Sequence, residues 1–135
     1  MNKCIWVLKN YFMKNDITNR ADIELLINSF YEKVKKDPLI AFFFTEIIPV
    51  NWEAHLPIMY GFWENILFYS GTYEGNPMAK HKALHQKCPM KMEHFQRWTS
   101  LFTETVEELF EGEKAELAKQ RAMSIATVMQ IKMFS

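Results

Sequence analysis

The chain has 135 residues, of which 49% are hydrophobic, and its 16 basic side chains balance its 16 acidic ones. This length and composition suit a single domain that buries one core without disulfide bonds. Because the formal net charge is zero, nothing favours electrostatic attraction to nucleic acid or to an anionic membrane, and we expect neither partner.

The first predicted element is a helix from about Asp22 to Lys36. Apolar residues return there at helical spacing on one stripe, namely Ile23, Leu26, Ile27, Phe30, Tyr31 and Val34. Pro38 ends the helix, since proline lacks the backbone N–H that helix continuation needs. The apolar run from Leu39 to Phe44 is ambiguous between a strand and a helical turn, and its helical neighbours favour a helical turn or corner.

A second helix is predicted from Asn51 to Tyr69. One of its faces carries His55, Met59, Phe62, Trp63 and Ile66. Pro57 falls within the first two turns, where proline is tolerated better than deeper in a helix. The following stretch from Ser70 to Pro77 contains two glycines and a proline, so we expect it to be irregular.

The second half of the chain is also predicted to be helical. A short helix runs from about Pro77 to Gln86, and a longer one from about Lys91 to Phe110. Gly112 then breaks the chain, and the last helix runs from about Glu113 to Met133. No strand pattern, internal repeat or low-complexity segment is present, so the expected fold class is all-α.

His81, His85 and Cys88 lie close together in the sequence and form a candidate metal cluster. The two histidines are four residues apart, on one face of the short helix. A structural zinc site normally takes four ligands, and neither a CxxC nor an HExxH element completes one. The alternative for either histidine alone is a satisfied core residue. The two cysteines, Cys4 and Cys88, do not suggest the disulfide framework of a small secreted protein. We therefore expect a reduced, soluble, cytoplasmic protein.

Tyr31, His55 and Trp98 lie on apolar faces of three different predicted helices. Each has a polar group that needs a partner when the side chain is buried. Together with a histidine on a short separate helix, they favour a cavity with a coordinating nitrogen on one side and hydrogen-bond donors on the other. A pentacoordinate haem needs both, because iron takes one axial nitrogen and the donors stabilise a diatomic ligand at the sixth position.

A family resemblance is carried by a series of short strings in a specific order. From about Asp16 to Lys132 the chain resembles the group III truncated haemoglobins of bacteria, through the strings Phe30-Tyr31-Glu-Lys-Val34, Trp52-Glu-Ala-His55, Phe62-Trp63, Tyr73-Glu-Gly-Asn-Pro77, Lys80-His81, His94-Phe-Gln-Arg-Trp98 and Arg121-Ala122. The resemblance implies a truncated globin fold, a two-over-two helical sandwich around haem b. The segment 1–12 would then be an extension to a globin domain over 13–135.

The resemblance also implies roles for individual residues. The proximal histidine, which ligates the iron, falls on His81 rather than His85. The residues implied to stabilise the distal ligand are Tyr31, His55 and Trp98. The residues implied to contact the haem are Phe44, at the corner after the first helix, with Phe42 and Phe43 as near alternatives, and Phe62 and Trp63 on the pocket wall.

Three activities are compatible with such a globin: O2 binding, nitric oxide dioxygenation and peroxide turnover. A polar distal pocket favours tight O2 binding and redox chemistry over transport, since each added donor slows ligand release. No flavin or nicotinamide motif is present, so a catalytic cycle would need an external reductase. The alternative function is that of a haem-free, globin-like interaction or sensor domain.

Overall fold

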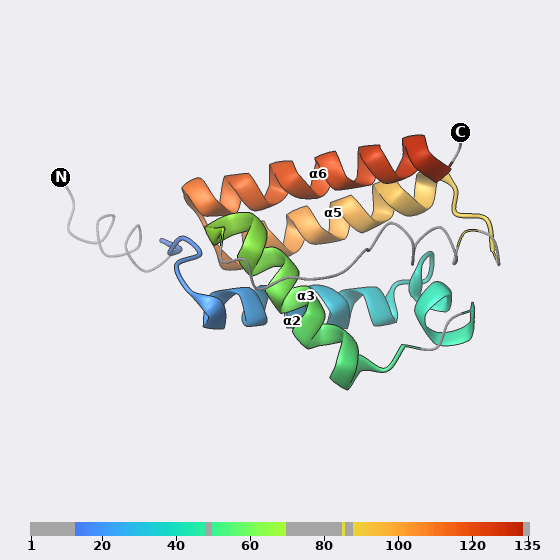
Figure 1. The fold of residues 1–135 in the computed structure, drawn as a ribbon, viewed down its shortest axis with the longest axis horizontal. Coiled ribbons are helices and arrows are strands. Elements are labelled where there is room, and N and C mark those ends of the chain that lie inside the picture. The colour runs from blue at the N-terminus through green and yellow to red at the C-terminus, as the bar shows by residue number, and fades with distance from the viewer. Residues whose placement is uncertain (1–12, 48–49, 70–84, 86–87, 134–135) are drawn as a thin grey trace, which may run out of the picture.

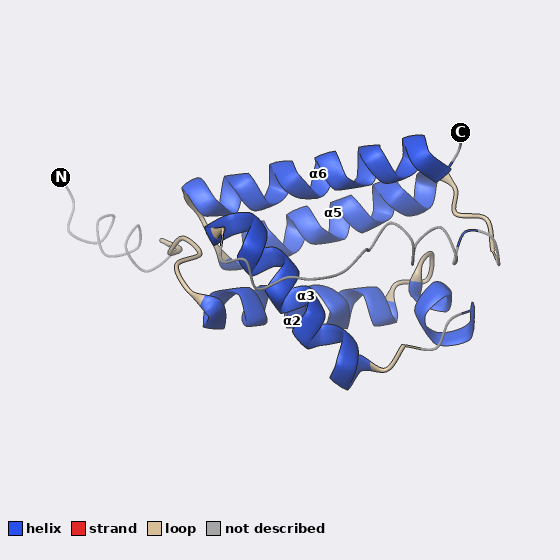
Figure 2. Cartoon of the chain, viewed as in Figure 1, coloured by secondary structure: helices blue, strands red, loops and turns tan. Residues whose placement is uncertain are grey.

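A computed structural model describes residues 13–47, 50–69, 85 and 88–133. Within these residues every regular element is a helix, as Figure 2 shows, so the all-α prediction is confirmed. The elements, with the labels of Figure 1, are α2 (Arg20–Lys36), η1 (Phe43–Ile47), α3 (Trp52–Phe68), α5 (Met92–Leu109) and α6 (Glu113–Met133). None of the helices in these ranges is both long enough and apolar enough to cross a membrane.

The four long helices form two layers. In Figure 1, α5 and α6 lie side by side and antiparallel, and α3 crosses α2 beneath them. Contacts between α2 and α5 and between α3 and α6 join the two layers. The core between the layers contains an aromatic cluster, in which the rings of Trp63 and Trp98 are both stacked on Phe102, at centroid distances of 4.6 and 5.9 Å. The pairing is the two-over-two arrangement that the family resemblance implies.

Helix α2 begins and ends through local hydrogen bonding and sterics. The side chain of Asn19 accepts a hydrogen bond of 2.9 Å from the backbone N–H of Asp22, which caps the first turn. The predicted apolar stripe is buried along its whole length. Asp37 leaves the helix in an extended conformation, as a residue before proline does.

The corner after α2 is built around the buried carboxylate of Asp37. This group accepts hydrogen bonds from the backbone N–H groups of Leu39 and Ile40, at 3.1 and 3.2 Å. It also accepts one of 2.7 Å from Nε of Arg97 on α5. The chain then winds into the π-helix η1, so the prediction of a helical corner is confirmed.

Helix α3 lies between the two residues predicted as its limits. Asn51 caps its N-terminus by accepting a hydrogen bond from the backbone N–H of Ala54, and Tyr69 ends it in the left-handed conformation, with φ of 54°. The helix continues through Pro57. The irregular segment predicted after it and the short helix predicted from Pro77 to Gln86 fall outside the described residues, apart from His85.

Gly112 separates α5 from α6, as predicted. Its φ of +142° is rarely adopted by residues with a side chain, and an added Cβ would meet the Asp16 carboxyl carbon at 2.6 Å. The Asp16 carboxylate accepts hydrogen bonds from the N–H groups of Lys114 and Ala115, at 2.9 and 2.8 Å. An acidic residue from the start of the described chain therefore caps the last helix.

Candidate functional site

Tyr31 and His55 meet where α2 and α3 cross. The Tyr31 oxygen and the Nε2 atom of His55 lie 3.4 Å apart, and the ring centroids are 5.5 Å apart. Tyr31 is 7% exposed, and His55 is half-buried. Of the polar groups predicted to face one interior cavity, these two are in direct contact.

Burial reinforces the protonated state of Tyr31. Its surroundings raise the pKa of the phenol far above the usual value, because desolvation penalises the phenolate. At neutral pH the side chain therefore keeps its proton and can donate a hydrogen bond. The tautomer of His55 decides whether its Nε2 accepts this proton or donates its own to the Tyr31 oxygen.

Two aromatic rings enclose this pair. Phe44 of η1 lies 6.3 Å from Tyr31, and Trp52, the first residue of α3, lies 5.1 Å from it, measured between ring centroids. Trp52 also contacts His55 at 5.7 Å. The hydroxyl and the imidazole thus lie against apolar walls, where hydrogen bonds are stronger than in water.

The corner contains three consecutive phenylalanines, and they have different neighbours. Phe44 contacts Tyr31 and Trp52, whereas Phe42 and Phe43 lie 6.2 and 4.8 Å from the ring of His94 on α5. Phe43 is 1% exposed and belongs to the core. Phe44 is therefore the phenylalanine that faces the Tyr31 and His55 pair.

The ring of Phe30 connects Trp98 to Tyr31. Trp98 is half-buried on α5, at 5.7 Å from Phe30 in an edge-to-face contact. Phe30 in turn contacts Tyr31 at 5.0 Å. The structure thus brings Trp98 and Tyr31 to neighbouring positions on one aromatic cluster.

The two predicted wall residues of α3 lie in different environments. Trp63 is 3% exposed and stacks on Phe102, so it lies in the core between the layers. Phe62 is half-buried and lines a hollow of about 510 Å³ between α3 and α6. Ile66 of α3 and Ile125 and Met129 of α6 contribute to the apolar lining of this hollow.

One face of α3 has large side chains that the described chain covers only in part. His55, Met59, Phe62 and Ile66 follow one another at helical spacing, and all are half-buried. The opposite side of α3 contributes the buried Gly61, Trp63 and Leu67 to the core. A half-buried apolar face that begins with a polar pair suits contact with a large flat apolar ligand.

The predicted axial ligand, His81, lies outside the described residues, whereas His85 is within them. Nδ1 of His85 accepts a hydrogen bond of 2.8 Å from the backbone N–H of Met90. A neutral imidazole whose Nδ1 accepts must carry its proton on Nε2. With that hydrogen bond in place, neither nitrogen of neutral His85 offers a lone pair to a metal ion.

The described part of the chain adds no support for a metal cluster of His81, His85 and Cys88. Among those residues no group of three or more potential metal ligands comes together. Cys88 is a half-buried free thiol. His81, the third member of the cluster, falls outside these ranges.

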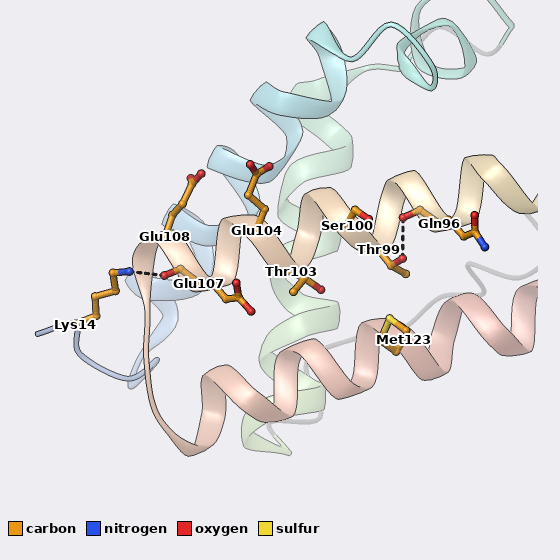
Figure 3. A pocket seen from close by; sticks show the side chains of 9 residues that line it. All are labelled: Lys14, Gln96, Thr99, Ser100, Thr103, Glu104, Glu107, Glu108 and Met123. Atoms are coloured by element: carbon orange, nitrogen blue, oxygen red, sulfur yellow. Dashed lines mark hydrogen bonds between the residues drawn. The ribbon is translucent and has the colours of Figure 1, made fainter. Parts of the chain in front are cut away.

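A larger hollow lies elsewhere, over the outer face of α5. It has a volume of about 760 Å³. Figure 3 shows the side chains that line it, which come from Lys14, Met123 and α5. Its glutamates are engaged by lysines: Lys33 binds Glu104 and Glu108, and Lys119 binds Glu107. None of the predicted site residues lines it, so we do not assign the site there.

Trp52 is the residue of this site to which the sequence assigned no role. It contacts Tyr31 and His55, the polar pair, and also Phe44 at the corner. Its spacing of three residues from His55 was the available signal, since such residues share a helix face. That signal is weak at the first position of a helix.

The family model described as bacterial-like globin matches residues 14–135. The group 3 truncated hemoglobin ctb of Campylobacter jejuni is 33% identical to the chain over 121 residues, which cover 87% of this chain and 93% of that protein.

A solved structure gives a match of the same kind. The crystal structure of group III truncated hemoglobin from Campylobacter jejuni superposes with a TM-score of 0.77 at 32% identity. The match covers 90% of this chain and 95% of that one.

Proposed function

Because this chain belongs to the bacterial-like globins and is a group III truncated haemoglobin, we propose that it binds haem b through His81 and holds O2 or nitric oxide beside Tyr31 and His55. Membership of this family implies haem and small diatomic ligands in general. The axial ligand, the polar distal pocket and the redox activity are the specific parts of the proposal.

The contact between Tyr31 and His55 is the observation that carries the proposal. A hydroxyl that stays protonated and an imidazole lie 3.4 Å apart within aromatic walls. Haem iron, when bound, supplies an open coordination position at which a diatomic ligand gains negative charge. The residues present fit this group, because the Tyr31 O–H can donate to such a ligand and the half-buried face of α3 can cover an apolar macrocycle.

The residues that we propose to hold the haem are those implied by the family resemblance, and their places in the fold are compatible with this role. Phe44 lies at the corner beside Tyr31, and Phe62 lies on the half-buried face of α3. Trp98 contributes an indole N–H from α5. Trp63, stacked in the core, would support this wall from behind.

His81 is favoured over His85 as the ligand by the hydrogen bond at Met90. A haem-ligating histidine coordinates through one nitrogen and donates the proton of the other. His85 Nδ1 accepts instead, which is the opposite arrangement. Loss of His85 should therefore leave iron binding intact.

Adding haemin to the purified protein and recording the absorption spectrum tests this proposal. The parent and His85→Ala should give the Soret band of a histidine-ligated haem, and His81→Ala should lose it or shift it. A Soret band unchanged in His81→Ala would contradict the ligand assignment. If the parent gave no band at all, the function would instead be that of a haem-free interaction or sensor domain.

We further propose redox chemistry rather than O2 transport, because the distal pocket offers several donors that slow ligand release. Nitric oxide dioxygenation, NO + O2 + e⁻ → NO3⁻, consumes one electron per turnover. A reductase in the cytoplasm would supply it, and peroxide turnover would need such a partner as well. Rapid oxidation of the oxygenated protein by nitric oxide in a stopped-flow experiment supports the first activity, and rapid low-affinity O2 exchange contradicts the redox proposal.

A further inference from the structure

Trp52 connects several groups of the proposed pocket through one ring. Its centroid lies 5.1 Å from that of Tyr31, with the two planes tilted by 57°. The imidazole of His55 lies 5.7 Å away and nearly perpendicular, at 79°. The same indole therefore contacts both polar residues, and its position is coupled to theirs.

Lys35 covers this indole from the last turn of α2. Its Nζ atom lies 4.5 Å from the centroid of the Trp52 ring, a cation–π geometry. The same ammonium forms an ion pair of 3.2 Å with Glu32, one turn earlier on α2. Trp52 thus contacts the ammonium of Lys35 and the phenol of Tyr31, which lies one turn earlier on α2.

The first turn of α3 contacts α2 through Trp52 and His55. Asn51, Glu53 and Ala54 are exposed, whereas Trp52 and His55 are half-buried. The first N–H groups of a helix lack acceptors within the helix, so an unpacked first turn frays easily. His55 belongs to this turn, and its orientation depends on what fixes the turn.

The hydrogen bond between His55 and Tyr31 is too long to fix that orientation by itself. At 3.4 Å the separation lies beyond the usual range of such bonds, and a long hydrogen bond is a weak one. Packing against neighbouring rings therefore contributes to the orientation. Trp52 contacts both partners.

We propose that Trp52 is a positioning residue that sets the orientation of the His55 imidazole relative to the Tyr31 hydroxyl, and that Lys35 holds Trp52 in place. The proposal rests on the function proposed above, and it identifies the residues that hold the distal hydrogen-bond donors in place. Trp52 acts through the two donors and does not itself bind the ligand.

The orientation can be measured by NMR as the nuclear Overhauser effect between the ring protons of His55 and Tyr31. Its assignment follows from its loss in His55→Gln. In Trp52→Leu the effect should fall sharply, because the imidazole loses the surface against which it packs. Trp52→Phe keeps an aromatic ring at this place and should retain most of the effect, which a general loss of packing volume would not predict.

The release of O2 from the haem-loaded ferrous protein gives a second measurement. If donation to the ligand depends on the orientation, Trp52→Leu should release O2 about 10-fold faster, the loss expected for one hydrogen bond. Trp52→Phe should stay within about 3-fold of the parent, and Lys35→Met should be about 2- to 3-fold faster, as loss of an exposed cation–π contact predicts.

Two variants serve as matched controls. Tyr60→Leu removes a half-buried aromatic from the same helix, where Tyr60 contacts Asn28 and Arg20 instead. Lys36→Met removes an exposed charge next to Lys35. Both should keep the Overhauser effect and the O2 release rate of the parent.

The proposal is overturned if folded Trp52→Leu retains the Overhauser effect at parental intensity, or if Tyr60→Leu loses it equally. If Trp52→Leu does not fold, Lys35→Met decides instead: a weakened effect supports the proposal, and an unchanged effect overturns it. The measurement also works on the haem-free full chain. A parent that takes up no haem would therefore contradict the proposed function and leave the positioning result standing.

Discussion

The hydroxyl of Tyr31 and the imidazole of His55 lie 3.4 Å apart although they are 24 residues apart in sequence. One comes from the middle of α2 and the other from the first turn of α3, so the crossing of these helices creates the pair. A polar pair within aromatic walls is costly to bury unless a ligand or a mutual hydrogen bond satisfies it. This contact is the basis for predictions about ligand release.

Removing only the hydroxyl of Tyr31 should accelerate ligand release. Tyr31→Phe keeps the contacts with Trp52 and Phe44 but cannot donate, so O2 should dissociate about 10-fold faster from the ferrous protein. Stopped-flow displacement of O2 by carbon monoxide measures this rate. Tyr60→Phe is the control, and a Tyr31→Phe rate equal to that of the parent would rule out Tyr31 as a donor to the ligand.

Asp16 should make the stability of the protein depend on pH. Burial by itself raises the pKa of this carboxyl, but hydrogen bonds from the N–H groups of Lys114, Ala115 and Ile17 outweigh it and lower the pKa below its ordinary value. The stabilisation is therefore present above the unfolded-state pKa and is lost as the pH falls through the folded-state pKa.

Asp16→Ala should reduce the free energy of unfolding by about 1–2 kcal/mol at neutral pH, as expected for a lost helix cap. The difference from the parent should shrink below the unfolded-state pKa of about 4. Urea unfolding across this range measures it. A difference that stayed constant down to strongly acidic pH would show that the Asp16 charge is not responsible.

Gly112→Ala should destabilise the protein through the backbone. The φ of +142° strains any residue with a Cβ, and the new methyl group would meet the Asp16 side chain at 2.6 Å. A cost of about 1–3 kcal/mol is expected, measured by thermal unfolding. Ser100→Ala, an exposed change within α5, should be nearly neutral, and equal melting temperatures for both variants would refute the strain.

The carboxylate of Asp37 should stabilise the conformation of the corner between α2 and η1. Asp37→Ala leaves the N–H groups of Leu39 and Ile40 without their acceptor and removes the bond to Arg97. We expect a loss of about 2–4 kcal/mol in unfolding free energy. Arg97→Gln should cost less, because Arg97 is half-exposed and the two N–H bonds persist. The reverse order in urea unfolding would contradict this account.

The segment 1–12 should be dispensable for haem binding. It lies outside the described residues, and the family match begins at residue 14. A chain that starts at Met13 should therefore give the same Soret band on haemin addition as the full chain. A well-expressed shorter chain that failed to bind haem would show that the domain boundary is misplaced.

Within the described residues, the sequence by itself determined the long helices and most of their limits. Helix α6 has the predicted bounds from Glu113 to Met133, and α3 lies between Asn51 and Tyr69, because capping, glycine and apolar periodicity act within a few residues. The same periodicity placed Tyr31 on the buried face of α2. Interactions between residues that are close in sequence are enough to determine helix limits and buried faces.

Only the tertiary structure decided which of these faces meet. It brought His55 to Tyr31, selected Phe44 over its two neighbours as an aromatic partner of Tyr31, and placed Trp52 against all three. It also joined Asp37 to Arg97 across 60 residues. Periodicity fixes the face on which a side chain lies but not the crossing angle or rotation of the helix against its partner, which depend on packing with segments distant in the sequence.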